Sequence, residues 1–498
     1  MRHFSIFVSM KGGLLILVLL FTFSWIDAQT CKDFVLRSNT APNVDLICSS
    51  AMVEDLKELK GFLEEIHPDL YRFISQKALD SAFYSAIELC KTDRTLFSFS
   101  EIINDFLSTI KDSHTLLNIR DLYRYKPASQ FYFPFYLQAI QGKYYVVDSW
   151  QNIIPKGSEF ISFNGTSPKA VLSSTLMFTP IEAQSYEAQQ ELSDHLVPAV
   201  LNLQHGLRQV KVSFINNQDT ITKTIKRMKS SKALRKIDKR NEASKISYER
   251  HNRKAILTIP SFSPRPTTGF KKNLDEIFNQ IQKDSIEDLA IDVRNNTGGY
   301  ILLQEYLMSF IAPKNSRYTN QYIYKRSNFD RFEQLSRYQR WRFKKTALRF
   351  YPNGAIAQEW DFFQSPMGTI DTVLNEPVLQ NKHNIVFNGT CTLFVNSLSM
   401  SASANLAAWF SLSKRGKIIG SRPSGTHTGT FANPCTVFLN NTALPIGIST
   451  MKVNATQTAH KDESLVPDLI IIPTREDLVK ENDVLKSYFL SQIGRAHV

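Results

Sequence analysis

The sequence of 498 residues has little that would make it a membrane-spanning, zinc-binding or repetitive protein. After the amino-terminal segment, no apolar run is long enough to cross a bilayer. The five cysteines form no Cys-x-x-Cys pair and no Cys/His spacing typical of zinc sites, and the chain has no internal repeat. Hydrophobic residues make up 43% and charged residues 21%, which are ordinary globular values and argue against a largely disordered chain. The length predicts more than one domain.

The amino terminus has the pattern of a signal peptide, which we predict over residues 1–28. Arg2 and Lys11 precede the apolar run Leu14–Phe23, which is too short to span a bilayer comfortably, and Ala28 offers a small residue for cleavage. We therefore expect the mature protein outside the cytoplasm, in the periplasm or the extracellular space.

The cysteines bear on both export and stability. Cys31 loosely suggests a lipoprotein cleavage site, but Thr30 is a poor residue just before it, so we expect export without a lipid anchor. An odd number of cysteines in an exported chain leaves at least one unpaired or paired between chains. Cys31 could bridge to Cys48 and Cys391 to Cys435, but burial as small hydrophobic residues fits these cysteines equally well.

The net charge of +13 is concentrated in two basic stretches, residues 223–240 and 326–349. No recognisable nucleic-acid-binding motif accompanies this charge, so we expect no nucleic-acid partner. A solvated linker and a surface insertion explain the two stretches better. Attraction to an acidic substrate or a cell-surface polymer stays open.

The hydrophobic patterns divide the chain into a helical domain over residues 51–125 and a β-rich module over 131–228. A basic linker, 229–244, leads to an α/β domain over 245–476 in which strands and helices alternate. An aromatic and basic insertion, 317–381, interrupts that domain.

Local signals place individual elements within these domains. Ser98-Phe-Ser-Glu101 is typical of a capping box at the start of the third helix of the helical domain. Gln141-Gly142 predicts the turn of a hairpin in the β-rich module. In the α/β domain, strands are predicted at Ala255–Ile259, Leu289–Val293 and Thr392–Val395.

Ser401 is the candidate nucleophile. The strand-like run Thr392–Val395 leads into the small-residue turn Asn396–Ser401, and the helix-like run Leu406–Phe410 follows. A turn at a strand-to-helix junction can expose a serine oxygen at the positive end of a helix dipole.

Gly298 and Gly299 follow a buried-looking strand, in the segment Asp292-Val-Arg-Asn-Asn-Thr-Gly-Gly299. Paired glycines allow close backbone approach, and their N–H groups can point at a developing negative charge. A plain turn is the alternative interpretation of this pair.

His114 is the candidate base, in Lys111-Asp-Ser-His114-Thr115. Its ordinary pKa lies near neutrality, which suits proton transfer, although a capping or core histidine would also fit this position. His427 and His460 lie closer to Ser401 in the sequence and compete with it for this role.

Three motifs occur in this order along the chain: Ser113-His114, Asp292 to Gly299, and Ser399-Met-Ser401. Together they resemble the motifs of the S41 serine peptidases, the tail-specific protease and tricorn-core superfamily. The resemblance implies an α/β, ClpP/crotonase-like catalytic domain after an amino-terminal helical bundle and a PDZ-like β module. It implies hydrolysis of a peptide or unfolded protein substrate, with no metal or organic cofactor and no membrane span. It leaves the oligomeric state open.

The resemblance also implies roles for single residues. Ser401 matches the nucleophile, and the N–H groups of Ala402 and of Gly298 or Gly299 match the oxyanion hole. Thr426 stands where the tail-specific branch has its lysine base, so the histidine-using, tricorn-like branch is the better match.

In the tricorn-like branch, Ser113 and His114 match the serine and histidine of the helical domain. Glu463 is the expected acid and Asp462 the alternative, since the segment around them only partly matches the family pattern. Ala404 replaces the glutamate usual after the serine motif.

These matches predict an exported serine peptidase that forms an acyl-enzyme on Ser401. The alternative is a degenerate relative that binds peptides or apolar ligands without cleaving them.

Overall fold

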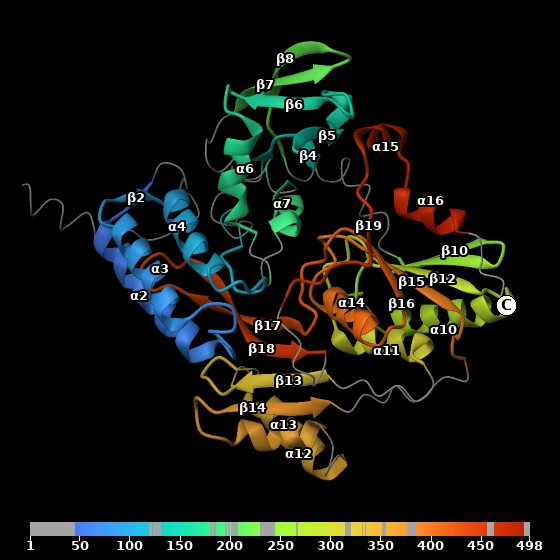
Figure 1. Cartoon of the computed structure of the whole chain (residues 1–498). Helices are drawn as coiled ribbons and strands as arrows, with labels where there is room; N and C mark the ends of the chain where they lie inside the picture. The colour runs from blue at the N-terminus through green and yellow to red at the C-terminus, as the bar shows by residue number, and fades with distance from the viewer. Residues whose placement is uncertain are drawn as a thin grey trace, which may run out of the picture.

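The structure is a computed structural model with three lobes (Figure 1). It describes residues 45–118, 122, 131–179, 182, 186–194, 197, 200, 208–229, 245–264, 267–313, 320–330, 332–333, 335–350, 355–375, 385–455 and 463–492. The predicted signal peptide, most of the basic linker, Cys31, His460 and Asp462 lie outside these residues. None of the described helices combines the length and the hydropathy that a bilayer crossing requires.

The helical domain consists of α2 (Ser49–Ile66), α3 (Gln76–Leu89) and α4 (Leu96–Ser108), joined at one end by the short strands β1 (Leu46–Ile47) and β2 (Arg94–Thr95). The helices bury the apolar stripes that their periodicity predicts. The third helix begins earlier than the expected capping box, because the Thr95 hydroxyl, and not that of Ser98, accepts the first free N–H of α4.

The β-rich module is an antiparallel sheet in the sequential order β4 (Phe135–Ile140), β5 (Lys143–Ser149), β6 (Glu159–Phe163), β7 (Gln209–Asn216) and β8 (Asp219–Lys226). Gln141 and Gly142 turn the first hairpin with positive φ, as predicted. Between β6 and β7 the chain forms α6 (Pro168–Leu176) and α7 (Tyr186–Asp194), which descend toward the other two lobes (Figure 1). The pair β3 (Phe131–Tyr132) and β9 (Met228–Lys229) closes the module.

A six-stranded sheet forms the centre of the α/β domain, in the order β10 (Ser247–His251), β11 (Lys254–Thr258), β12 (Asp288–Asp292), β15 (Thr390–Val395), β16 (Gly416–Gly420) and β19 (Leu469–Ile470). All its pairs are parallel except β10–β11. The helices α10 (Thr267–Lys283), α11 (Ile301–Ile311) and α14 (Ala402–Leu412) pack on one face around a core of apolar side chains. The strands β12 and β15 therefore end side by side, each just before one of the predicted site segments.

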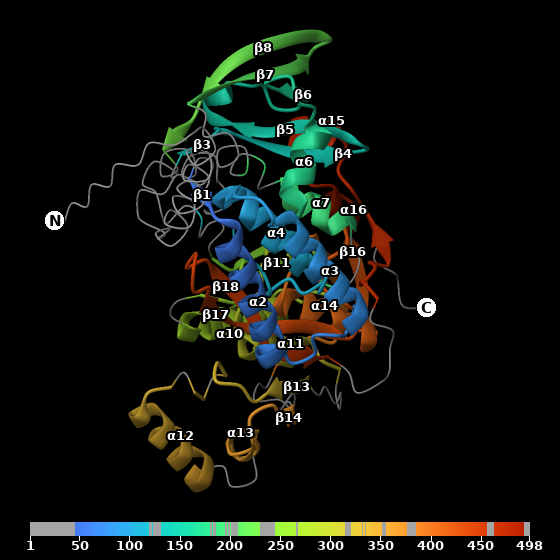
Figure 2. The same cartoon turned by 90° about the vertical axis from the view of Figure 1, so that its left-hand side faces the viewer.

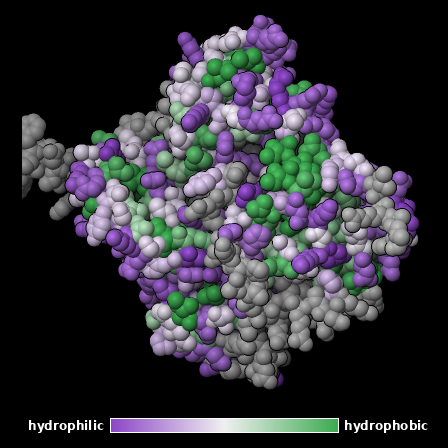
Figure 3. Space-filling model, viewed as in Figure 1, coloured by the Kyte–Doolittle hydropathy of each residue, from purple (hydrophilic) through white to green (hydrophobic). Residues whose placement is uncertain are grey.

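The carboxyl-terminal elements cover the rest of this domain. The helix α16 (Val484–Ser491) packs on the other face of the sheet, where Phe489 meets Phe394. The short helix α15 (Arg475–Lys480) lies next to the β-rich module, and Arg475 donates a hydrogen bond to the carbonyl of Gly157. Figure 3 shows an apolar patch right of centre in this region, where Ile470, Ile472 and Val479 are exposed.

The predicted insertion is not a separate surface excursion. Its strands β13 (Asn320–Lys325) and β14 (Ile370–Asn375) extend the long hairpin β17 (Gly429–Phe438) and β18 (Pro445–Asn454) into one antiparallel sheet, in the order β14-β13-β18-β17. The helices α12 (Arg337–Phe350) and α13 (Ala355–Phe363) connect the two added strands. The physical reason is apolar burial, since Tyr324 and Val373 share a core with Phe362 and Val453.

The hairpin β17–β18 also completes the helical domain. Val437 and Ile446 belong to the same buried cluster as the helices α2 to α4. The second view shows these helices lying across the hairpin (Figure 2). The helical domain and the α/β domain are therefore joined through one sheet.

Of the two interpretations of the cysteines, disulfide bridging and burial as small hydrophobic residues, the structure favours burial. Cys391 on β15 and Cys435 on β17 are buried in two different sheets and form no disulfide, so the possible bridge between them is wrong and the alternative, burial, is what the structure has. Burial raises the pKa of both thiols, to about 12 for Cys391 and about 11 for Cys435. Both behave as small hydrophobic residues.

Asp55 provides a test of how the helical domain is joined to the hairpin. Its fully buried carboxylate on α2 accepts hydrogen bonds from the backbone N–H groups of Asn441 and Thr442 and from the Thr442 hydroxyl, at 2.9, 2.9 and 2.6 Å. We expect Asp55→Ala to leave these donors unsatisfied and to lower the free energy of unfolding by about 3 kcal/mol in urea titrations. Lys57→Ala, at an exposed position on the same helix, is the control and should change stability by less than about 0.5 kcal/mol. Equal effects of the two changes would contradict this joint.

Candidate active site

Ser401 lies at the turn between β15 and α14, where the sequence predicts it. Its backbone has φ 52° and ψ −120°, a region that costs non-glycine residues free energy and is found at functional turns. The Ser401 side chain is partly exposed, and its Oγ forms no hydrogen bond with the part of the chain that the structure describes. A strained strand-to-helix turn that presents a serine oxygen is the arrangement of a nucleophile.

Gly298 packs directly against this turn. A Cβ at position 298 would lie 2.6 Å from the Ser401 Cβ and 2.9 Å from the backbone nitrogen of Ala402, and the φ of Gly298 is +97°. No other residue fits there without displacing the nucleophile. The glycine that the sequence singled out is therefore required for close approach.

The serine turn is also fixed by neighbouring loops. The Ser399 hydroxyl donates to the carbonyl of Val293 at 2.8 Å, and the Met400 N–H donates to the carbonyl of Asn296 at 3.2 Å. On the other side, the Ser424 hydroxyl donates to the carbonyl of Ser397 at 2.8 Å. These bonds keep the nucleophile in a single position relative to the loop of the paired glycines.

The hydrogen bonds distinguish the candidate oxyanion donors. The N–H of Gly298 is occupied, because it donates to the Asn296 side-chain oxygen at 2.9 Å. The N–H groups of Gly299 and Ala402 have no acceptor among the described residues. Of the three predicted donors, Gly299 and Ala402 are thus the two that are open to a substrate oxygen.

Arg294 anchors the loop before the glycines. Its guanidinium makes two-pronged ion pairs with Asp292 at the end of β12 and with Asp483, which caps α16. Burial works against the charge of Arg294, but the hydrogen bonds of both carboxylates outweigh it and raise the pKa of the guanidinium. The glycine loop is thereby tied to the last helix of the described chain.

The place of the lysine base of the tail-specific branch is occupied by a threonine. The Thr426 hydroxyl donates to the carbonyl of Gly429 at 2.8 Å and is itself 3.3 Å from the guanidinium of Arg72, which also donates to Thr428 at 2.6 Å. Arg72 comes from the helical domain, so a cation does reach this loop from another part of the chain. Arg72 always carries its charge and cannot act as a base. At Ala404, a small residue is needed because Gly425 packs against it.

His114 lies in the loop after α4, next to the hairpin β17–β18. Its Nδ1 is 3.2 Å from the Ser113 hydroxyl, 3.7 Å from an Asp112 oxygen and 4.0 Å from a Glu182 oxygen. We assign the ring proton to Nδ1, because oxygen atoms surround that nitrogen, and this leaves Nε2 as the acceptor.

Asp112 is the carboxylate that organises this group. It is fully buried and accepts hydrogen bonds from the His114 backbone at 2.8 Å, the Thr115 hydroxyl at 2.5 Å and His67 Nε2 at 3.2 Å. His67 donates through Nε2, because its Nδ1 accepts the N–H of Asp69. Burial disfavours the charge of Asp112, but the hydrogen bonds from His114 and His67 outweigh it and hold the pKa of the carboxyl well below its usual range.

Glu182 is the site residue that sequence reasoning missed. It comes from the segment between α6 and α7 and is fully buried, where it accepts hydrogen bonds from the Thr430 hydroxyl and from the N–H of Phe431. Burial and the nearby charge of Asp112 raise the pKa of Glu182 to about 7, against the opposing effect of Arg72 and His114. No sequence signal marks it, because it belongs to no motif and lies in a different domain.

The two carboxylates, Asp112 and Glu182, in turn act on His114. Burial alone would lower the pKa of His114, but the hydrogen bond to Asp112 and the charges of Asp112 and Glu182 outweigh it, so the pKa is raised. Glu463, the expected acid, is exposed and makes no hydrogen bond or ion pair with His114. Its carbonyl accepts the N–H of His427, so these two candidates lie beside each other.

One segment of the chain, residues 424–431, contacts both the turn that holds Ser401 and the residues around His114. Ser424, at its start, holds the serine turn, and Thr430 and Phe431, at its end, hold Glu182 beside His114. Ser401 and His114 form no direct hydrogen bond in this structure. Such bonds are often long before a substrate is bound.

Among the described residues, Asp112, His114 and Glu182 also form a group that could hold a metal ion, because one ligand atom from each lies within 4.8 Å of the others. The oxygens of Asp112 already accept three hydrogen bonds from protein donors. The arrangement is explained by these bonds without a cation.

Comparisons with known proteins agree with this geometry. Residues 253–471 match the sequence profile of peptidase family S41. The α/β domain, which contains these residues, therefore has the sequence features of an S41 peptidase domain. The comparison with curated proteins found no match. The family assignment makes the chain a serine-type peptidase, as the sequence predicted.

Solved structures show the same fold. The structure of mature CPAF complexed with lactacystin has a TM-score of 0.61 and 13% identity, and the match covers 89% of this chain and 97% of that one. Mature CPAF alone gives a TM-score of 0.60 and 14% identity, covering 89% of this chain and 96% of that one.

Gly298→Ala tests the close approach at the nucleophile. The added methyl group would press on Ser401 and Ala402 at a positive φ, so we expect at least a hundredfold loss of peptidase activity, measured as kcat/KM. Gly269→Ala is the matched control, because nothing lies within 4 Å of its added Cβ, and activity should be unchanged. Thermal unfolding of both variants would show whether the loss is local. Full activity of Gly298→Ala would contradict the geometry.

Proposed function

We propose that this S41 peptidase is exported and hydrolyses peptide bonds through an acyl-enzyme on Ser401, with His114 as the base. The observation that supports this best is the packing of Gly298 against Ser401 and the Ala402 nitrogen. In support of the proposal, Ser401 has a strained backbone, and the N–H groups of Ala402 and Gly299 have no acceptor among the described residues. Acyl transfer makes use of all these features together.

In the proposed reaction the Ser401 oxygen attacks the substrate carbonyl and His114 Nε2 takes its proton. The proton then passes to the leaving amine, and a water molecule repeats the sequence to release the acid. The Gly299 and Ala402 N–H groups would stabilise the oxyanion, each contributing about 3 kcal/mol. Asp112 would hold the imidazolium that forms, since it is charged and fixed by three hydrogen bonds.

The substrate class follows from the family and from the site's surroundings. We propose a peptide or an unfolded protein, because an extended chain can reach a serine that lies beyond the carboxyl end of a sheet strand. Tyr300 and Leu302 directly follow the glycine loop and expose half or more of their surface, 50% and 69%. They offer apolar contact to substrate side chains beside the oxyanion donors. The β-rich module would act as a PDZ-like domain that receives a peptide end or strand.

Labelling with a fluorophosphonate tests the nucleophile. The wild-type protein should take up one label and cleave a denatured protein such as casein, whereas Ser401→Ala should do neither. Ser403→Ala is a control on the neighbouring helix, where the hydroxyl is fully buried, and it should keep both properties. A wild-type protein that binds peptides but takes up no label would support the degenerate, non-cleaving relative instead.

The same assay separates the competing bases. His114→Ala should reduce turnover by at least a thousandfold while leaving the fold intact, and His427→Ala should have less effect. Turnover that survives in His114→Ala but is lost in His427→Ala would assign the base to His427, with Glu463 as its neighbour.

The pH dependence tests the role of Glu182. His114 accepts a proton only in its neutral form, so kcat/KM should fall as pH drops through its raised pKa, with a midpoint above about 6.5. Glu182→Gln removes a charge that raises this pKa, so the acid limb should move to lower pH. Glu276→Gln, on the exposed surface of α10, should leave the profile unchanged. Identical acid limbs in wild type and Glu182→Gln would exclude Glu182 from the environment of the base.

A further inference from the structure

The helix α12 is set apart from the rest of the molecule by its composition and its position. It holds six Lys or Arg residues and no acidic residue in Arg337–Phe350. It follows the strand β13 in the chain and lies at the outer end of the four-stranded sheet, and both views show it projecting from the body of the protein (Figures 1 and 2). It is at the opposite end of the molecule from the β-rich module. This position gives it no part in the proposed chemistry.

One face of α12 carries cations and aromatic rings together. Tyr338, Trp341, Arg342 and Lys345 follow the spacing of a single helix face, and all are exposed. Tyr338 exposes 65% and Trp341 54% of its surface, and their rings stack at 6.0 Å. The Lys345 ammonium lies 5.0 Å from the centre of the Trp341 ring. We refer to these four residues as the α12 face.

Four cations of this helix have no acidic partner among the residues that the structure describes. Arg342 and Lys345 form no ion pair with any carboxylate that the structure describes, and the same holds for exposed Arg337 and Lys344. Arg340 is different, since it points inward and pairs with Glu333 at 3.0 Å. The outward cations are therefore open to a partner of negative charge.

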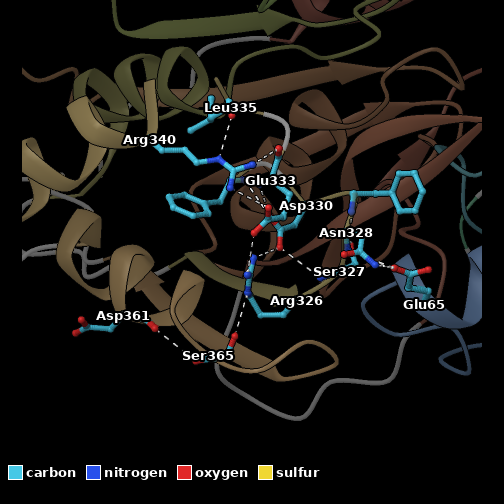
Figure 4. Close-up of polar contacts among 12 residues, drawn as sticks. Glu65, Arg326, Ser327, Asn328, Asp330, Glu333, Leu335, Arg340, Asp361 and Ser365 are labelled. Atoms are coloured by element: carbon cyan, nitrogen blue, oxygen red, sulfur yellow. Dashed lines mark hydrogen bonds and ion pairs between the residues drawn. The ribbon is translucent and has the colours of Figure 1, made fainter. Parts of the chain in front are cut away.

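An internal ion-pair network holds α12 in place (Figure 4). Arg326, 5% exposed, pairs with Asp330 and, at 3.2 Å, with Glu333, which in turn binds Arg340 of α12. Arg340 also donates to the carbonyl of Leu335, and Ser336 with Gln339 forms reciprocal caps at the start of the helix. The Asn328 side chain links the same loop to Glu65 of α2 at 2.9 Å. The α12 face is thus presented by a fixed scaffold.

We propose that the α12 face binds the surface of a membrane that contains anionic lipid. Basic helices with exposed Trp and Tyr lie in the plane of the bilayer interface, where the rings settle among the headgroups and the cations meet the lipid phosphates. The face is a convex helix at the tip of the molecule, which suits a flat surface. A single-stranded nucleic acid, in contrast, is usually bound in a groove that follows its backbone.

Vesicle co-sedimentation of the full chain tests this. Binding to phosphatidylcholine vesicles should require added phosphatidylglycerol and should weaken as salt is raised. Each cation removed from the face should reduce partition about fivefold, so Arg342→Gln with Lys345→Gln should reduce it about 25-fold. Trp341→Ala should weaken binding further and should remove a shift of tryptophan fluorescence on adding vesicles.

The control is Lys169→Gln with Lys226→Gln, two exposed lysines of the β-rich module that have the same charge and no ion pair in the described chain. This pair should bind vesicles within about twofold of the wild type. Peptidase activity should be unchanged in every variant, which verifies folding.

Two results would overturn the proposal. One is vesicle binding that falls equally in the α12 and control pairs. The other is vesicle binding that stays at the wild-type level in the α12 pair while binding to an oligonucleotide or a polyglutamate peptide is lost.

Discussion

The catalytic half of this protein depends on the parallel pairing of β12 with β15. Parallel neighbours end at the same edge of a sheet, so the glycine loop after β12 and the serine turn after β15 are forced together. A side chain at position 298 would prevent the final approach, and its absence lets Ser401 adopt its strained backbone beside Gly298. The hydrogen bonds from Ser399 and Met400 then hold that strain in place.

The histidine half has a different physical basis, which is a buried charge. Asp112 is charged without any contact with water, and this is tolerated because three donors converge on it. Those donors come from the loop after α4 and from His67, so the carboxylate fixes the shape of the helical domain where it meets the hairpin β17–β18. Glu182 then adds a second carboxyl from the β-rich module, and its raised pKa lets it sit beside Asp112 without full repulsion. All three lobes therefore contribute to the surroundings of one imidazole.

Sequence patterns predicted the elements whose cause is local. The strand β12, the serine turn and the hairpin at Gln141-Gly142 follow from apolar runs and turn residues, and the structure has them at the expected positions. The strand β17 was not predictable, since Asn433 and Pro434 interrupt its pattern. The structure accommodates them as an irregularity at Asn433, with φ 53°, on an edge strand of the sheet.

The site shows the same limit. Ser401, the paired glycines and His114 lie in recognisable motifs. Glu182 acquires its role only through burial against Thr430 and Phe431, which the sequence cannot reveal because those contacts are between distant segments. The occupied N–H of Gly298 depends in the same way on the rotamer of Asn296, so the sequence could not distinguish Gly299 as the open donor.

Arg294 has a consequence for the order in which the protein matures. It ties the loop of the oxyanion glycines to Asp483, at the start of the last described helix. During synthesis the helical domain and the β-rich module emerge before the α/β domain. The glycine loop gains its final anchor only after residue 483 has left the ribosome. A polypeptide that is still being made thus lacks the ion pair that fixes the glycine loop against the last described helix.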